Sequence, residues 1–154
     1  FPDNFFDLVV SSGVLHHTPE TYTCFTECYR VLKPGGGAKI TLYYKGLLHA
    51  KPVFRFTTAI MKLLQVRHPG ANLATAVDVD EFIRQYDGFD NPVGIGKTKR
   101  EWSALLQRAG FRIVGSEIHF FPKRFLPFGD KVPKVFYSIL DRYFGTMIYF
   151  DLKK

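Results

Sequence analysis

The sequence predicts an α/β fold, and three neighbouring segments carry this prediction. Residues 5–10 are an apolar run ending in two valines, which is typical of a strand buried in a parallel sheet. Thr18 and Pro19 offer an N-cap and a first-turn proline, so a helix should start there and stop at the glycine-rich turn 33–37. Residues 38–44 ("AKITLYY") form the next strand. A strand, a helix and a strand joined by short loops make a βαβ unit, whose crossover is right-handed.

The middle of the chain is predicted to be helical and then irregular. Residues 53–64 form an amphipathic helix with lysine and arginine on its polar face. Asp78, with Glu81 three residues later, caps a second, short helix. The stretch 87–96 is rich in turn residues and reads as a loop. The apolar stripe of the first helix consists of Val53, Phe56, Ile60, Met61 and Leu64.

Regular alternation returns in the last third of the chain. Thr98 and Glu101 form a capping box for a helix. Residues 111–121 alternate as a strand, and residues 146–154 close the chain as another strand. Between them, residues 132–144 form a strongly amphipathic helix. The apolar side chains on one face of that helix are Val132, Val135, Phe136, Ile139, Leu140, Tyr143 and Phe144.

Composition limits the class of protein. With 154 residues, of which 46% are hydrophobic, the chain can form one packed domain or part of one, and disorder is excluded. No apolar run approaches the length of a membrane span. The net charge of +7 favours nucleic acid, anionic lipid or an acidic substrate without choosing among them. Cys24 and Cys28 suit reduced thiols in a cytoplasmic protein, and no ligand cluster indicates a metal.

Polar residues follow the first strand at the end where ligands bind. In an open parallel sheet, ligands lie at the carboxyl ends of the strands, and Ser11, Ser12 and Gly13 occupy that place. Glycine lets the backbone approach a ligand closely, and hydroxyls offer hydrogen bonds. His16 and His17 precede the helix and can face the same crevice. These residues alone leave two readings open: a ligand site, or a turn followed by two solvent-facing histidines.

Two longer stretches carry a family resemblance. "FPDNFFDLVVSSGVLHHTPE" followed by "ECYRVLKPGGGAKITLYYKG" resembles the class I S-adenosylmethionine-dependent methyltransferases, in the branch that contains small-molecule methyltransferases. The resemblance covers residues 1–45, and "LLQRAGF" (105–111) with its following strand is similar to the family's later helix and strand. Residues 47–96 match nothing general, as expected where this family varies its acceptor lid.

The resemblance implies the C-terminal half of a Rossmann-like methyltransferase fold: a mostly parallel sheet with an antiparallel last strand and helices on both faces. Residues 1–154 would be a partial methyltransferase domain. Its parts would be a cofactor-side strand–helix–strand (1–45), a variable helical acceptor or lid insertion (46–97) and a helix–strand–helix–strand (98–154). The family's early glycine-rich cofactor turn is missing. We therefore expect the N-terminal half to be absent and strand 5–10 to present an unpaired apolar edge.

The resemblance also implies site residues, with S-adenosyl-L-methionine as cofactor and no metal. His17 takes the place where several relatives carry a histidine beside the transferring methyl, which makes it a candidate general base; bonding to the backbone at the helix start is its other reading. Tyr43 and Tyr86 are candidate substrate contacts, although core packing is the commoner role of such tyrosines. The residues expected to line the cofactor crevice are Ser11, Ser12, Gly13 and Val14.

The implied function is methyl transfer from S-adenosylmethionine to a small-molecule acceptor, lipid-like acceptors included, by a longer chain. The 154 residues alone are expected to be inactive, and their partners would be the acceptor and the missing half. The sequence shows no stacking or phosphate-binding motif for nucleic acid. A membrane surface would suit helix 53–64 and the nearby Lys45, Lys51, Arg55, Lys62 and Arg67. The alternatives left open are a non-catalytic remnant or partner-binding fragment, and an RNA- or membrane-lipid-directed methyltransferase.

Overall fold

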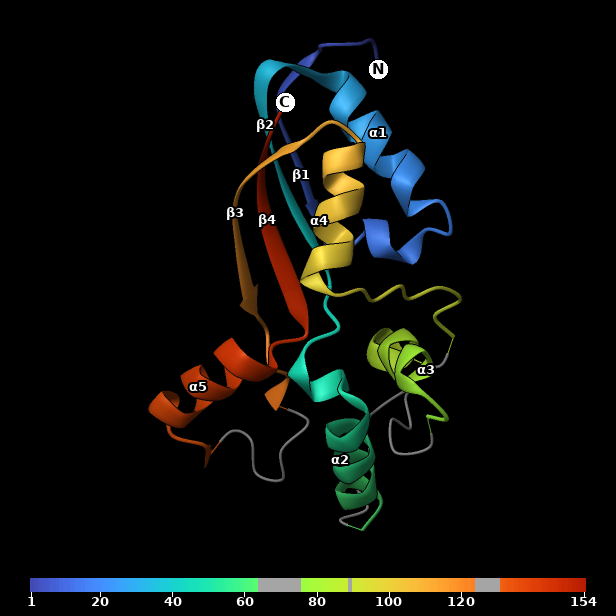
Figure 1. Ribbon diagram of the computed structural model, residues 1–154, viewed down its shortest axis with the longest axis vertical. Coiled ribbons are helices and arrows are strands. Elements are labelled where there is room, and N and C mark those ends of the chain that lie inside the picture. The colour runs from blue at the N-terminus through green and yellow to red at the C-terminus, as the bar shows by residue number, and fades with distance from the viewer. Residues whose placement is uncertain (64–75, 89, 124–130) are drawn as a thin grey trace.

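The computed structural model describes residues 1–63, 76–88, 90–123 and 131–154, arranged as Figure 1 shows. Each strand and helix expected from the sequence is present in these residues. In chain order the elements are β1 (Phe6–Ser12), the 3-10 turn η1 (Leu15–His17), α1 (Thr21–Val31), β2 (Leu32–Tyr43), η2 (Leu47–His49), α2 (Lys51–Leu63), α3 (Val79–Arg84), η4 (Gln85–Asp87), α4 (Lys99–Arg108), β3 (Arg112–His119), α5 (Lys134–Phe144) and β4 (Met147–Lys153).

The four strands form one sheet in the order β1-β2-β4-β3. β1 runs parallel to β2, while β4 is antiparallel to both of its neighbours, β2 and β3. This is the expected mostly parallel sheet with an antiparallel last strand. Among the described residues β1 pairs with β2 alone, and its Leu8 and Val10 are 54% and 63% exposed. The predicted apolar edge is therefore present.

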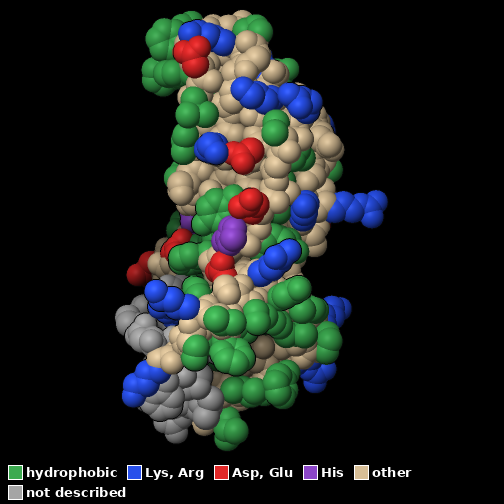
Figure 2. All heavy atoms as spheres, turned by 90° about the vertical axis from the view of Figure 1, so that its left-hand side faces the viewer, with side chains coloured by type: hydrophobic (Ala, Val, Ile, Leu, Met, Phe, Trp, Pro, Cys, Tyr) green, Lys and Arg blue, Asp and Glu red, His purple; other side chains and the backbone are tan. Residues whose placement is uncertain are grey.

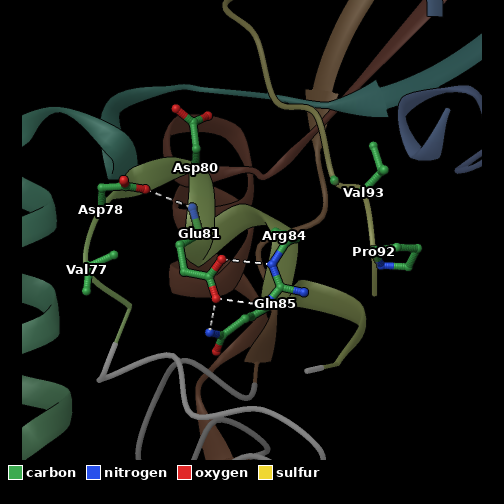
Figure 3. A pocket seen from close by; sticks show the side chains of 9 residues that line it. Val77, Asp78, Asp80, Glu81, Arg84, Gln85, Pro92 and Val93 are labelled. Carbon is green, nitrogen blue, oxygen red and sulfur yellow. Dashed lines mark hydrogen bonds and ion pairs between the residues drawn. The ribbon is translucent and has the colours of Figure 1, made fainter. Parts of the chain in front are cut away.

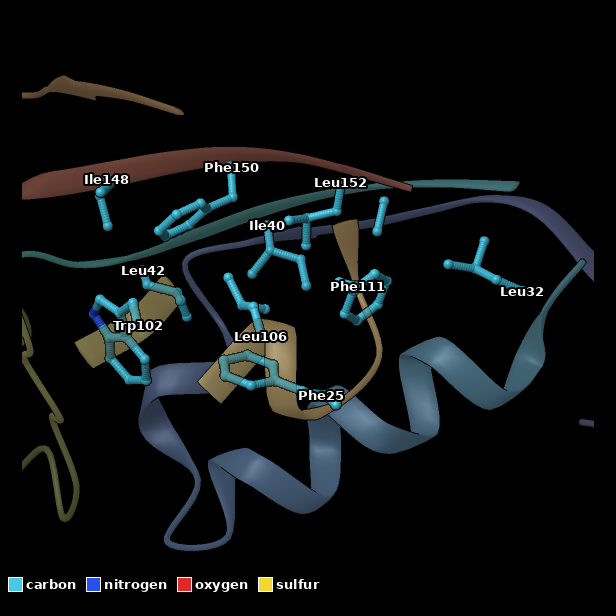
Figure 4. Close-up of a cluster of buried hydrophobic side chains, with 12 residues drawn as sticks. Phe25, Leu32, Ile40, Leu42, Trp102, Leu106, Phe111, Ile148, Phe150 and Leu152 are labelled. Carbon is cyan, nitrogen blue, oxygen red and sulfur yellow. The ribbon is translucent and has the colours of Figure 1, made fainter. Parts of the chain in front are cut away.

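One face of the sheet packs against α1 and α4, and Figure 4 shows the core between them. Side chains alternate along a strand, so every second residue of β2 and of β4 points to this face. Phe25 of α1 and Trp102 and Leu106 of α4 are fully buried against them. The Trp102 indole Nε1 donates to the Tyr43 carbonyl at 2.7 Å, which satisfies the polar atom of the ring. The core consists of Phe25, Leu32, Ala38, Ile40, Leu42, Trp102, Leu106, Ala109, Phe111, Ile148, Phe150 and Leu152.

A second cluster surrounds the carboxyl end of β2, where α2, α3 and α5 meet (Figure 1). α5 packs against the carboxyl end of β3 (Figure 1). The Asp141 carboxylate of α5 contacts the His119 Nδ1 of β3 at 2.8 Å. The buried members of the cluster are Tyr43, Leu48, Phe54, Met61, Phe82, Ile83, Tyr86 and Phe121.

The face that α2 buries is different from the apolar stripe expected from its sequence. Its buried residues are Phe54, Thr58 and Met61, whereas Phe56 is 67% exposed. Thr58 can lie inside because its hydroxyl donates to the Phe54 carbonyl at 2.9 Å. Leu64, the last residue of the expected stripe, lies outside the described residues. The packing of the second cluster thus overrides the helix's own apolar periodicity.

The beginning of α1 and the glycine-rich turn also differ from expectation. α1 begins at Thr21 and not at Pro19, because the Thr18 hydroxyl donates backward to the Leu15 carbonyl at 2.7 Å. Residues 33–37 are a bulge inside β2: register passes from Phe6–Leu32 to Leu8–Gly37. The capping box of Thr98 and Glu101 and the Asp78 cap are confirmed.

Candidate functional site

The carboxyl end of β1 presents three exposed or half-exposed residues beside the open sheet edge. Ser12 is exposed, Val14 is 56% exposed, and Gly13 lies between them with a φ of +70°, which favours glycine. No atom lies within 4 Å of where a Gly13 side chain would begin, so the backbone here is open to an approaching group. Ser11 instead turns inward, and its buried hydroxyl has no hydrogen-bond partner among the described residues. The four predicted cofactor residues thus form one turn. Ser12, Gly13 and Val14 are exposed or half-exposed, and the Ser11 hydroxyl is buried beneath them.

His17 is held in place by the loop that follows α3. Its Nδ1 lies 2.7 Å from the Val93 carbonyl, so Nδ1 carries a hydrogen and donates it. Its Nε2 lies 3.2 Å from Asp87 Oδ2, and the side chain is 26% exposed. A protonated ring satisfies both contacts, whereas a neutral ring keeps its lone pair at Nε2. The backbone hydrogen bond fixes the ring orientation, and the only nitrogen able to accept a proton is Nε2.

Asp87 links His17 to Tyr43. The Tyr43 hydroxyl donates to the same Asp87 Oδ2 that faces the His17 ring. Tyr43 is only 4% exposed, and its ring stands edge-on to His17 with the centroids 5.3 Å apart. The structure therefore joins one candidate substrate residue to the candidate base through a carboxylate. The turn-rich loop prediction indicated where this carboxylate lies but not that it joins these two side chains.

His16, the neighbour of His17, is the buried member of the pair. It is 1% exposed, and its ring lies against Tyr43 with 3.8 Å between centroids. Burial lowers the pKa of His16 to about 4, so the ring is neutral at pH 7. Neither ring nitrogen has a hydrogen-bond partner among the described residues. Two adjacent histidines in a turn do not reveal from the sequence which one points inward.

Tyr86, the second candidate substrate residue, packs against the Tyr43 ring. Its ring stands edge-on to Tyr43 with centroids 5.3 Å apart, and its hydroxyl lies 2.6 Å from His49 Nε2. The Gly46 amide donates to His49 Nδ1, so His49 Nε2 carries the hydrogen and donates to Tyr86. Burial lowers the pKa of His49 to about 4. Tyr43 and Tyr86 lie together within an aromatic cluster.

A hollow of about 520 Å³ lies beside this cluster, between α3 and the loop that holds His17. Figure 3 shows Glu81 at its wall, bonded to Arg84 and Gln85. These hydrogen bonds lower the pKa of Glu81 to about 2. Val93 borders the hollow as well as bonding His17, so the hollow adjoins the predicted site. The residues lining it are Val77, Asp78, Asp80, Glu81, Arg84, Gln85, Pro92, Val93 and Gly94.

Sequence comparison matches the N-terminal part of the chain. A family model described as a methyltransferase domain matches residues 1–39. Phosphoethanolamine N-methyltransferase 2 of Caenorhabditis elegans is 48% identical over 46 residues, which are 30% of this chain and 10% of that protein. Cycloartenol-C-24-methyltransferase of Arabidopsis thaliana is 51% identical over 35 residues, 23% of this chain and 10% of that protein. Residues 1–39, which the family model matches, include every predicted cofactor residue.

Structural comparison covers the whole chain. An S-adenosylmethionine-dependent methyltransferase from Mesorhizobium loti matches all of this chain and 64% of its own length, with a TM-score of 0.59 and 19% identity. A Burkholderia thailandensis 1,6-didemethyltoxoflavin-N1-methyltransferase with bound S-adenosylhomocysteine matches with a TM-score of 0.51 and 19% identity, over all of this chain and 46% of that one. The [4+2]-cyclase SpnF also matches, with a TM-score of 0.53 and 18% identity, over 51% of its length. The resemblance to class I methyltransferases is confirmed at the level of the fold, which this chain spans in part.

Proposed function

We propose that this chain, which has the class I methyltransferase fold, supplies the C-terminal half of an S-adenosylmethionine-dependent methyltransferase site for a small-molecule acceptor. The observation that carries the proposal is the Ser12–Gly13–Val14 turn at the carboxyl end of β1. It lies at the open sheet edge, and the His17–Asp87–Tyr43 network lies directly behind it. Ligands of open α/β sheets bind at this end of the strands. An upstream half pairing with β1 would close the site from the other side.

The residues at this turn fit the proposed cofactor. Gly13 leaves open space where a side chain would stand, which allows close approach of a ligand to the backbone. The buried Ser11 hydroxyl and the His16 ring have polar atoms without hydrogen-bond partners in the described part of the chain, and buried polar atoms are normally satisfied. Ser12, Gly13 and Val14 would hold the cofactor. When bound, S-adenosylmethionine supplies an activated methyl group on its sulfonium.

In this proposal, His17 takes the acceptor's proton at Nε2. The Val93 carbonyl fixes the ring through Nδ1, and the Asp87 carboxylate stabilises the protonated ring from 3.2 Å. Tyr43 donates its hydroxyl hydrogen to Asp87 and so holds that carboxylate in position. The neighbouring His16 stays neutral and shields the network from water because it is buried. Proximity and orientation supply most of the remaining rate enhancement.

We propose that the methyl acceptor is a small molecule, and we assign it to no particular compound. The two curated relatives are named for phosphoethanolamine and for cycloartenol, and their matches cover only 46 and 35 residues of this chain. The acceptor pocket would instead be formed by residues 46–97, which carry Tyr86 and the hollow. A cytoplasmic setting is supported by the free thiols of Cys24 and Cys28.

The test is calorimetric titration with S-adenosylhomocysteine, the expected product. One sample is this chain, and the other is the chain extended by its upstream sequence. Binding by the extended chain and none by this chain supports the half-site proposal. Binding by neither contradicts the methyltransferase proposal and leaves a remnant that has the fold without the chemistry. If the extended chain binds, methyl transfer to phosphoethanolamine and to cycloartenol is then assayed, with His17→Gln as the variant expected to lose turnover and retain cofactor binding.

A further inference from the structure

Two helices at the lower end of the molecule turn apolar side chains to solvent. On α2, Phe56 and Leu63 are 67% and 80% exposed. On α5, Val135 and Phe136 are 71% and 63% exposed, and Ile139 and Tyr143 continue the same side of the helix. Figure 2, which views the molecule from the side of α5, shows hydrophobic side chains gathered over this end. Contiguous exposed apolar surface of this kind marks an interaction site.

These exposed side chains are not core positions that failed to pack. α2 already buries its opposite face through Phe54, Thr58 and Met61. α5 packs Tyr137, Leu140 and Phe144 against the second cluster, and these lie on the side away from Val135. Both helices therefore have one face in the protein and a second apolar face directed outward. A helix that serves only the fold needs the first face alone.

The charges beside these faces are all positive. α2 carries Lys51, Arg55 and Lys62 and has no acidic residue. α5 carries Lys134 and Arg142, while its one acid, Asp141, turns inward to His119 and to the Phe121 amide. Across the described residues, none of the ion pairs includes any of these five cations. These cations are therefore available to an anionic surface.

We propose that the exposed faces of α2 and α5 dock on an anionic lipid bilayer, with the apolar side chains at the headgroup boundary and the cations at the phosphates. Amphipathic helices with basic flanks bind membranes in this way. With 13 and 11 residues the two helices are too short to span, and no helix in the described ranges is long and apolar enough to cross a membrane. A symmetric contact with a second copy would instead bring unpaired cations of like sign together. The proposal does not depend on methyl transfer.

The experiment is sedimentation of the 154-residue chain with vesicles of phosphatidylcholine, either alone or mixed with phosphatidylserine, at low and high salt. We expect binding to the phosphatidylserine vesicles at low salt, weakened by salt and weak on phosphatidylcholine alone. Size-exclusion chromatography of the same samples reports self-association. Failure to sediment with phosphatidylserine vesicles at low salt overturns the proposal.

Two matched pairs of variants locate the surface. Arg55→Gln/Lys62→Gln on α2 should weaken binding by about fivefold per cation. Lys99→Gln/Arg100→Gln removes two exposed cations of α4, whose large apolar side chains are not exposed, and should have little effect. Val135→Ser should weaken binding roughly tenfold, and Val114→Ser, at a valine of β3 that is 59% exposed against 71% for Val135, should not. Circular dichroism checks that each variant folds. Equal losses within either pair, or a dimer that Val135→Ser dissociates, overturn the proposal.

Discussion

The two buried clusters differ in what they contain. The core between the sheet and α1 and α4 is made of apolar side chains, with the polar atom of Trp102 satisfied by a backbone carbonyl. The cluster at the carboxyl end of β2 mixes apolar residues with the polar aromatics Tyr43 and Tyr86 and encloses His49, while His16 packs on Tyr43. The first cluster holds the sheet together, whereas the second keeps ionisable groups in a protein interior. We expect the first region to carry most of the stability and the second to carry the chemistry.

The largest expected effect comes from a cavity in the apolar core. Leu106→Ala removes a fully buried side chain and should lower the free energy of unfolding by about 2–5 kcal/mol. Urea denaturation measures the change. The matched control is Leu63→Ala at an 80% exposed position, where a change within about 0.5 kcal/mol is expected. Equal effects at the two leucines would show that the core does not carry the stability.

The polar cluster should make stability depend on pH. Burial lowers the folded-state pKa of His16 and of His49 to about 4, while an unfolded histidine titrates near 6.5. The unfolded state therefore binds more protons between these values. Stability is complete above about pH 6.5 and falls as pH drops towards 4, by on the order of 3 kcal/mol per histidine. Denaturation measured across this range tests it, and His16→Leu should reduce the slope; an unchanged slope would show that His16 is not the source.

A hydroxyl deletion probes a single bond in the same cluster. Tyr86→Phe leaves the hydrogen of His49 Nε2 without the acceptor that now lies 2.6 Å away, which should cost about 1–3 kcal/mol of unfolding free energy. Tyr149→Phe, at a residue 40% exposed, is the control and should change stability by less than about 0.5 kcal/mol. If both variants have the same free energy of unfolding as the parent protein in urea denaturation, the buried hydrogen bond between His49 and Tyr86 does not contribute to stability.

The smallest effect is expected at His119, on the surface between β3 and α5. Hydrogen bonding to Asp141 and to Glu117 raises the pKa of His119. This is the opposite direction from His16, so its contribution is present below pH 6.5 and disappears as pH rises through the folded pKa. His119→Gln should thus differ from the parent at acidic pH and converge with it at alkaline pH. If the two proteins differ by the same free energy of unfolding at every pH, the role of His119 does not depend on its charge.

Local patterns allowed the strands and helix caps to be predicted. The capping box of Thr98 and Glu101 needs only residues three apart, and β1 needs only a short apolar run. The beginning of α1 was misplaced because the Thr18 hydroxyl had two possible partners, and its bond to Leu15 cannot be read from the sequence. The spacing of residues along the chain therefore predicts an interaction when both partners are close in the sequence.

Features that depend on distant partners were not predictable in the same way. The apolar periodicity of α5 is real, but periodicity reports which residues share a face and not whether another element covers it. Likewise, the sequence placed His16 and His17 in one turn, yet only the packed Tyr43 ring determines which of them is buried. Asp87 ends the 3-10 turn η4, 70 residues from His17, and no spacing rule links the two.

Gly110, at the end of α4, restricts how this sequence can vary over evolutionary time. Its φ is +105°, and a side chain there would begin 2.7 Å from the Tyr29 ring of α1. A substitution consequently meets two independent obstacles, backbone strain and a steric clash. Shrinking Tyr29 would remove the clash and leave the strain. Among natural variants, glycine should thus persist at position 110 even where position 29 has become small.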